Sequence, residues 1–263
     1  MVALTIGVEI KGLDAIRASL NGMGKQVDFA TAKALTRTAH AVNRGVQDAM
    51  RSTFKGGATP YSLRAMRVKA ATRENLSAIV ALRDDAPGKG TPWSKALGHL
   101  FNGGPRAWKR MEGAFRRIGV LPQGQIMVPG SACPLDGYGN PPRSLIVQLI
   151  AYFNAFNQQG FRANMTDKRR ANLAGKRGAK ITGVEYFISR GPGMWYGRQQ
   201  RLPAGIWSRT GTHGSDIKPV FMFVNAGSYR KLIDMERIAR SIVAKVWDVE
   251  FTAAMAEAMR TAR

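Results

Sequence analysis

The sequence predicts an α+β fold, in which a small, mostly antiparallel sheet packs against two long amphipathic helices and carries a large loop-rich insertion. Residues 28–54 contain no Pro and repeat apolar side chains every three or four positions, as do residues 234–260. Short runs rich in Ile, Val, Phe and Trp precede the second of these segments and are bounded by Gly and Pro, which is typical of strands. Two long helices that bracket a small sheet favour the α+β class, with the helices on one face.

Composition sets the outer bounds of the interpretation. The chain has 263 residues, of which 44% are hydrophobic, and this suits one elaborated domain or two small ones. Lys and Arg together number 40 against 17 Asp and Glu, so the formal net charge is +23. Such a charge favours a polyanionic neighbour, which is DNA, RNA, a membrane surface or an acidic protein face. Charge alone does not choose among these.

Cysteine content and hydropathy exclude some classes. Cys133 is the only cysteine, which excludes an internal disulfide and a zinc site built from several cysteines. No window reaches the roughly 20 apolar residues that span a bilayer, and the N-terminus lacks the pattern of a signal peptide. We therefore expect a soluble protein that is made in the cytoplasm and has no membrane partner.

Residues 1–83 form the predicted N-terminal half of the core. Residues 2–10 alternate apolar side chains like a strand, and a short helix is expected to begin after Gly12. The long helix 28–54 follows, and two β-prone runs, 62–72 and 76–83, are expected to form a hairpin. The predicted buried stripe of the long helix consists of Leu35, Ala39, Val42, Val46 and Ala49.

Basic side chains line the opposite side of this first long helix. At about 100° per residue they project within one narrow sector, and Asp48 is the acidic residue near them in sequence. A solvated helix face is the simpler interpretation, but five cations in one sector favour a surface that meets an anionic partner. These candidate contact residues are Lys33, Arg37, Arg44, Arg51 and Lys55.

Residues 84–183 form the predicted insertion. Turn residues dominate up to about residue 142, with short helices expected at 94–101 and 107–118, and a longer helical pattern covers 143–158. The most charged loop of the chain, residues 160–183, comes next, and we expect it to stay mobile until it meets a partner. Its candidate contact residues are Arg162, Lys168, Arg169, Arg170, Lys176, Arg177 and Lys180.

Residues 184–263 form the predicted C-terminal half of the core. Three strands are expected at 185–189, 205–209 and 217–224, and the last long helix follows them. Its predicted apolar stripe consists of Ile238, Ile242, Val246, Val249 and Ala253.

The sequence offers little for catalysis. The three histidines, His40, His99 and His213, lie far apart and outside any metal-binding spacing. Cys133 lies in a loop with no evident base, and no glycine-rich nucleotide motif occurs. Trp207 lies among arginines and could stack on bases, although core packing is the commoner role for such a residue, and the same holds for Trp195 and Tyr196. We therefore predict no catalytic, cofactor, metal or small-molecule site, and a protein that is not an enzyme.

Two segments resemble a known family. Residues 10–50, which include KGLDAI and AKALTRTAHAVNR, resemble the opening of tailed-bacteriophage neck and tail-completion proteins, and are most similar to the minor tail protein Z family. LPAGIWSRTG, IKPVFMFV and YRKLIDMERIARSIV resemble the closing strands and final helix of that family. The resemblance covers roughly residues 8–83 and 184–260. The insertion 84–183 departs from the family pattern.

This resemblance implies a structural virion protein of a tailed phage. Such a protein forms a homo-oligomeric ring, sixfold or twelvefold, at the head–tail neck, where it completes the tail and joins it to the portal or adaptor. The basic residues would then meet packaged DNA in the lumen or acidic rims of adjacent rings. The alternative is a basic DNA-binding protein without a virion role. A phage nuclease is a third interpretation, but its acidic metal cluster cannot be assembled from these scattered carboxylates.

Overall fold

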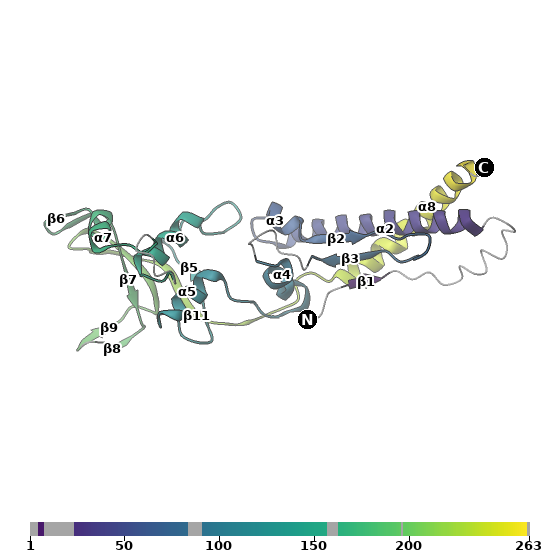
Figure 1. The fold of residues 1–263 in the computed structure, drawn as a ribbon. Helices are drawn as coiled ribbons and strands as arrows, with labels where there is room; N and C mark the ends of the chain where they lie inside the picture. The colour runs from purple at the N-terminus through teal and green to yellow at the C-terminus, as the bar shows by residue number, and fades with distance from the viewer. Residues whose placement is uncertain (1–4, 8–23, 84–90, 157–162, 196, 262–263) are drawn as a thin grey trace. The chain divides into compact units, whose positions relative to one another are not determined.

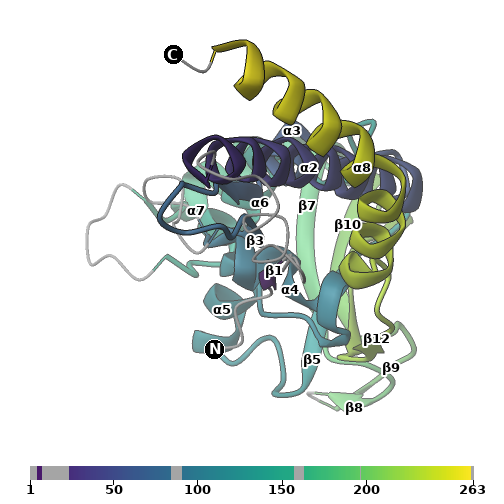
Figure 2. The same cartoon turned by 90° about the vertical axis from the view of Figure 1, so that its right-hand side faces the viewer.

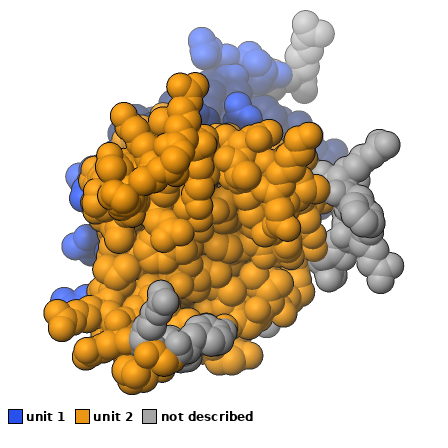
Figure 3. All heavy atoms as spheres, turned by 90° about the vertical axis from the view of Figure 1, so that its left-hand side faces the viewer, with its two compact units in different colours: residues 1–106, 228–263 blue, residues 107–227 orange. Residues whose placement is uncertain are grey.

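The computed structural model describes residues 5–7, 24–83, 91–156, 163–195 and 197–261 (Figure 1). The chain folds into two compact units, which Figure 3 colours separately. Unit 1 consists of residues 1–106 and 228–263, and unit 2 consists of residues 107–227. Both helices and antiparallel sheets are present, so the predicted α+β class is confirmed.

Two long helices dominate unit 1, as predicted. Helix α2 (Gly24–Thr53) and helix α8 (Met235–Thr261) lie side by side (Figures 1 and 2). The apolar stripe of α2 is buried, and near its N-terminal end Ala30 and Ala34 pack against Ala254 and Ala258 of α8. Small side chains at these positions allow the two backbones to come close together.

The predicted apolar stripe of α8 is wrong in its second half. Val249 is 68% exposed, and Ala253 is exposed as well. The contact with α2 passes instead through Ala254 and Ala258, which lie on a neighbouring side of the helix. Because alanine contributes little to an apolar periodicity, the larger Val249 misled the sequence interpretation.

A small antiparallel sheet completes unit 1, with strand order β1-β3-β2. The predicted hairpin is confirmed, but it is shorter than expected, because a turn of helix capped by Thr59 occupies the beginning of its first arm. The rest of the strand predicted at 2–10 and the helix predicted after Gly12 lie outside the described residues. The elements are β1 (Thr5–Gly7), α3 (Pro60–Leu63), β2 (Met66–Lys69), β3 (Ile79–Leu82) and α4 (Trp93–Asn102), and one further pair of short strands joins β4 (Gly104–Pro105) to β12 (Ser228–Tyr229).

Unit 2 is built on a five-stranded antiparallel sheet with order β5-β11-β10-β7-β6. Its core contains Phe115, Leu149, Ile206 and Phe221, which come from two helices and two strands. The three strands predicted between 185 and 224 are confirmed as parts of β7, β10 and β11. The elements are α5 (Arg110–Arg117), β5 (Gln125–Pro129), α6 (Arg143–Tyr152), α7 (Asp167–Ala174), β6 (Lys176–Arg177), β7 (Lys180–Ser189), β8 (Gly193–Trp195), β9 (Arg198–Gln200), β10 (Gly205–Thr212) and β11 (Asp216–Asn225).

A buried carboxylate joins α5 to the sheet of unit 2. Glu112 is 1% exposed, and its two oxygens accept hydrogen bonds from the backbone N–H groups of Lys109, at 2.8 Å, and Met127, at 2.9 Å. Lys109 precedes the first turn of α5 and Met127 lies in β5. The carboxylate therefore satisfies two backbone donors that belong to different elements.

The compact units do not follow the segments 84–183 and 184–263 expected from composition. Strand β11 pairs with β5, and β7 pairs with β10, so the stretch 185–224 shares one sheet with residues of the predicted insertion. The inserted unit therefore runs from 107 to 227, and only α8 and its lead-in return to unit 1. Composition marks turns, but strand pairing between distant segments decides which sheet a strand joins.

The stretch 160–183, expected to be a loop, holds regular structure in its described part, because α7, β6 and the first residues of β7 lie there. Thr166 caps α7 by accepting a hydrogen bond from the backbone N–H of Arg169 at 3.3 Å. Gly175 ends the helix in the left-handed conformation, with φ of 54°. Local capping therefore supports a helix in a segment that the sequence predicted to be a loop. Arg162 lies outside the described residues.

Candidate functional site

The basic sector of α2 is divided between internal and external roles. Lys33 forms an ion pair with Glu257 of α8, and Arg37 pairs with the same carboxylate at 3.3 Å. The hydrogen bond from Lys33 is the main reason that the pKa of Glu257 is lowered. Two of the five predicted contact residues thus hold α2 to α8.

The other cations of this sector point to solvent. Arg51 pairs with Asp48 at 2.6 Å on the surface of α2. Arg44 and Lys55 are exposed, and within the described part of the chain neither forms an ion pair. The helix therefore offers fewer cations to a partner than the sequence predicts.

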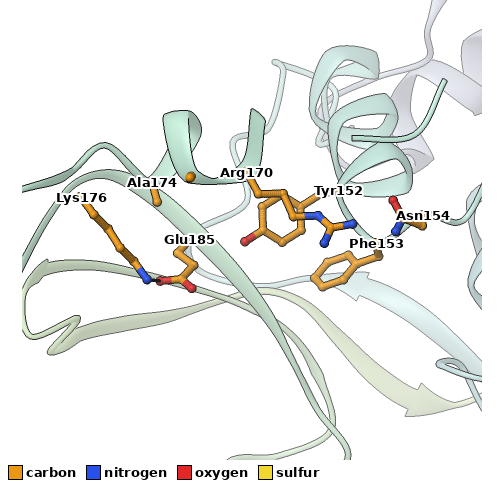
Figure 4. Close-up of a pocket in the computed structure, with 8 residues that line it drawn as sticks. Tyr152, Phe153, Asn154, Arg170, Ala174, Lys176 and Glu185 are labelled. Atoms are coloured by element: carbon orange, nitrogen blue, oxygen red, sulfur yellow. Dashed lines mark ion pairs between the residues drawn. The ribbon is translucent and has the colours of Figure 1, made fainter. Parts of the chain in front are cut away.

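The second group of predicted cations gathers at α7 and the adjoining strands. Lys168, Arg169 and Arg170 lie on α7, Lys176 and Arg177 form β6, and Lys180 begins β7. Arg170 and Lys176 line a cavity of about 540 Å³, which Figure 4 shows in close-up. The other residues of its wall are Tyr152, Phe153, Asn154, Ala171, Ala174 and Glu185.

A close approach between α7 and β7 shapes this cavity. A side chain at Gly183 would overlap the backbone carbonyl of Leu173, so only glycine allows the helix to lie this near the strand. The left-handed turn at Gly175 then returns the chain into β6, next to β7.

Glu185 is the acidic residue of the cavity wall. It lies directly opposite Arg209 in the β7–β10 register. Arg209 Nε donates a hydrogen bond to Oε2 at 3.1 Å, and Nη2 lies 3.0 Å from Oε1 in an ion pair. Lys176 Nζ lies 3.3 Å from the same carboxylate. The pKa of Glu185 is lowered, chiefly by the hydrogen bond from Arg209, and partial burial opposes this shift.

Arg170 and Tyr152 complete the chemistry of the cavity. The guanidinium carbon of Arg170 lies 5.7 Å from the Tyr152 ring centroid, and Nη1 pairs with Asp167 at 2.8 Å. The Tyr152 hydroxyl accepts a hydrogen bond from the backbone N–H of Tyr186 at 3.3 Å, and burial raises the pKa of this phenol. The phenol therefore stays protonated near neutral pH and is not suited to abstract a proton in this cavity.

The structure gives local roles to other residues that the sequence singled out. Trp207 is 8% exposed and donates a hydrogen bond to the Pro203 carbonyl at 3.1 Å, which confirms the core interpretation. His99 packs edge-on against Tyr229, and Cys133 is buried. His213 lies in a turn with φ of 54°. The side chains of Trp195 and Tyr196 lie outside the described set.

Sequence reasoning did not single out Glu185, Tyr152 or the cavity itself. Glu185 is recognisable only once its cross-strand partner Arg209 is known, because the two residues are 24 positions apart. Across the described ranges, no three His, Cys, Asp or Glu side chains come together as a metal site would require. Nor do those ranges contain a helix with the length and apolarity needed to cross a membrane.

Comparisons with protein families, with curated proteins and with solved structures find no match. The likeness to the minor tail protein Z family thus remains a prediction from the sequence. The surfaces and the chemistry of the two units are what bear on function.

Replacing Glu185 by Gln is expected to make the stability of the protein fall less steeply as the pH is lowered below about 4.3. Because the folded-state pKa is lowered, the stabilisation from Glu185 is complete above the ordinary glutamate value of about 4.3. It is lost as the pH falls through the lowered value. Thermal unfolding followed by circular dichroism between about pH 6 and about pH 3 measures this difference.

Asp48→Asn is the control for this measurement, since Asp48 is an exposed residue of α2 whose surface ion pair contributes little. It should follow the wild-type profile. If the unfolding temperatures of the wild-type protein and of Glu185→Gln fell equally with decreasing pH, the ion pair with Arg209 would not stabilise the fold.

Proposed function

We propose that the protein is a structural virion protein of a tailed phage, made in the host cytoplasm and built into the neck between head and tail. In this role it forms a ring, completes the tail and joins it to the portal or adaptor. The sequence resemblance described above supplies this position. The observation that carries the proposal is the exposure of two large apolar side chains on α8, where Val249 is 68% and Met259 is 46% exposed.

Exposed apolar side chains on a long helix favour association with other chains. Ala253 and Ala256 are also exposed near Val249, and the exposed Lys245 and Thr252 lie one helical turn from it. If this side of α8 meets a different surface of the next copy, the contact is heterologous, and it closes into a ring when the rotation allows.

The charges have separate uses in this proposal. Lys33 and Arg37 are engaged by Glu257 within the chain, so they serve the helix pair. Arg44 and Lys55 remain for packaged DNA or for acidic rims of neighbouring rings. The function is assembly, with no catalytic turnover.

Val249→Lys is expected to reduce self-association, because a buried ammonium would replace an apolar contact between copies. Native mass spectrometry and negative-stain imaging of the purified protein, alone and with adaptor or tail partner, measure the oligomer. Wild-type protein should give rings, and the variant should give mainly monomers.

Ala244→Lys is the matched control. Ala244 is also an exposed residue of α8, and it lies about 140° around the helix from Val249. It should assemble like wild type. A wild-type protein that stays monomeric with its partners present would exclude the ring.

The alternative is a DNA-binding protein without a virion role, which the exposed Arg44 and Lys55 favour. It differs from the ring in its oligomeric state and in its response to salt. Such a protein would bind duplex DNA as a monomer, with an affinity that falls steeply as the salt concentration rises.

A further inference from the structure

Helices α6 and α7 of unit 2 line an open groove of about 830 Å³, separate from the wall of the Glu185 cavity. Arg143 and Val147 are one helical turn apart on α6, and Arg169 and Leu173 are one turn apart on α7. Met165 lies just before α7 and also faces the groove. The remaining lining residues are Ser144, Gln148 and Asn172.

The groove combines an apolar floor with a basic rim. Val147 is 44% exposed, although it is a large aliphatic residue, and Met165 and Leu173 are half-buried against the core of unit 2. Arg143 and Arg169 are exposed, and within the described residues neither guanidinium has a carboxylate partner. No acidic residue is among those that line the groove.

We propose that this groove binds an acidic amphipathic helix of another protein. Val147, Met165 and Leu173 would receive the apolar side chains of such a helix, and Arg143 and Arg169 would pair with its flanking carboxylates. The 10 residues of α6 and the 8 of α7 correspond to lengths of about 15 Å and 12 Å, which suits two or three helical turns of a partner.

Charge complementarity argues for a foreign partner over a second copy of this chain. The chain has 17 Asp and Glu against 40 Lys and Arg, and even α8, which has four carboxylates, has four Lys and Arg and uses Glu250 and Glu257 to pair with α2. The apolar floor argues against DNA, because phosphate contacts use cations and do not need exposed aliphatic side chains. The inference rests on the proposed assembly role for its setting, since it gives the chemistry of a neighbour in that assembly.

A designed peptide tests the groove directly. The probe is a fluorescein-labelled helix of about three turns, with Leu along one side and Glu on both flanks, and its binding is measured by fluorescence anisotropy. A second peptide carries Lys at every Glu position. Using the Val249→Lys protein keeps self-association out of the measurement, so that failure of the groove and failure of the ring are distinguishable.

Two changes in the groove are expected to weaken binding of the acidic peptide at least about tenfold. They are Val147→Glu, which places a charge on the floor, and the double variant Arg143→Glu, Arg169→Glu, which reverses the rim. The matched control, Arg177→Glu with Lys180→Glu, makes the same charge change at exposed positions outside the groove and should stay within about twofold of wild type. Circular dichroism confirms that each variant is folded.

Several results would overturn the proposal. They are equal binding of the Lys peptide, an equal loss in the control double variant, or no detectable binding of the acidic peptide at millimolar concentration. Duplex DNA provides the last comparison. If the acidic peptide does not bind but duplex DNA does, and if DNA binding is lost on changing Arg143 and Arg169 but not Val147, the surface is a nucleic-acid site.

Discussion

Replacing Glu112 by Ala is expected to destabilise the protein by about 3 kcal/mol, because the change removes a buried acceptor of two backbone hydrogen bonds. Glu112 is 1% exposed, and its carboxylate satisfies the backbone N–H groups of Lys109 and Met127. Removing it leaves the Met127 donor buried without this acceptor, breaks the tie between α5 and β5, and opens a cavity. Urea unfolding followed by circular dichroism gives the change in free energy.

Glu236→Ala is the control for this experiment. Glu236 lies in the first turn of α8, where it makes an exposed i,i+4 ion pair with Arg240, so its loss should cost well under about 1 kcal/mol. Glu112→Gln keeps the shape but turns one acceptor into a donor, and should fall between the two. If Glu112→Ala unfolded at the same urea concentration as wild type, the buried carboxylate would not be a structural tie.

Replacing Gly45 by Leu is expected to lower the free energy of unfolding by about 3 kcal/mol, because the larger side chain would overpack the core of unit 1. A Cβ atom at this position of α2 would overlap the Cδ1 atom of Ile242 on α8. Alanine is tolerable, because the end of Ile242 can rotate away, but a leucine side chain would push the two helices apart. Thermal unfolding measures the change.

Gly98→Leu is the matched control, because Gly98 also lies within a helix, α4, and a Cβ atom there has no neighbour within 4 Å. Both substitutions gain about the same helix propensity. Only Gly45→Leu should lower the unfolding temperature, and equal effects would mean that α2 and α8 do not pack closely at this point.

Local patterns predicted the elements of the fold well. The 3–4 spacing of Leu35, Val42 and Val46 predicted α2 and its buried side, and runs of aromatic and β-branched residues predicted β7, β10 and β11. These features depend on residues that are near one another in sequence. The two β-prone runs 62–72 and 76–83 similarly predicted the hairpin that β2 and β3 form.

Long-range pairing was beyond the sequence. Nothing local in Gln125–Pro129 indicates that it pairs with Asp216–Asn225, and this pairing moves the boundary of the inserted unit from 183 to 227. The basic candidates show the same limit. Charge periodicity placed Lys33 and Arg37 on one side of α2, but it could not show that Glu257, more than 200 positions away, neutralises them.

The short antiparallel pair of β4 and β12 bears on how a chain with an inserted unit can evolve. Pro105 pairs with Ser228 and Gly104 with Tyr229, so the chain leaves unit 1 and returns to it at adjacent positions. A chain segment whose two ends lie next to each other can be inserted, deleted or exchanged while the rest of the fold keeps its structure. Residues 107–227 therefore have the organisation of an inserted domain that can be replaced as a whole, and unit 1, with the α2–α8 helix pair, is the domain into which it is inserted.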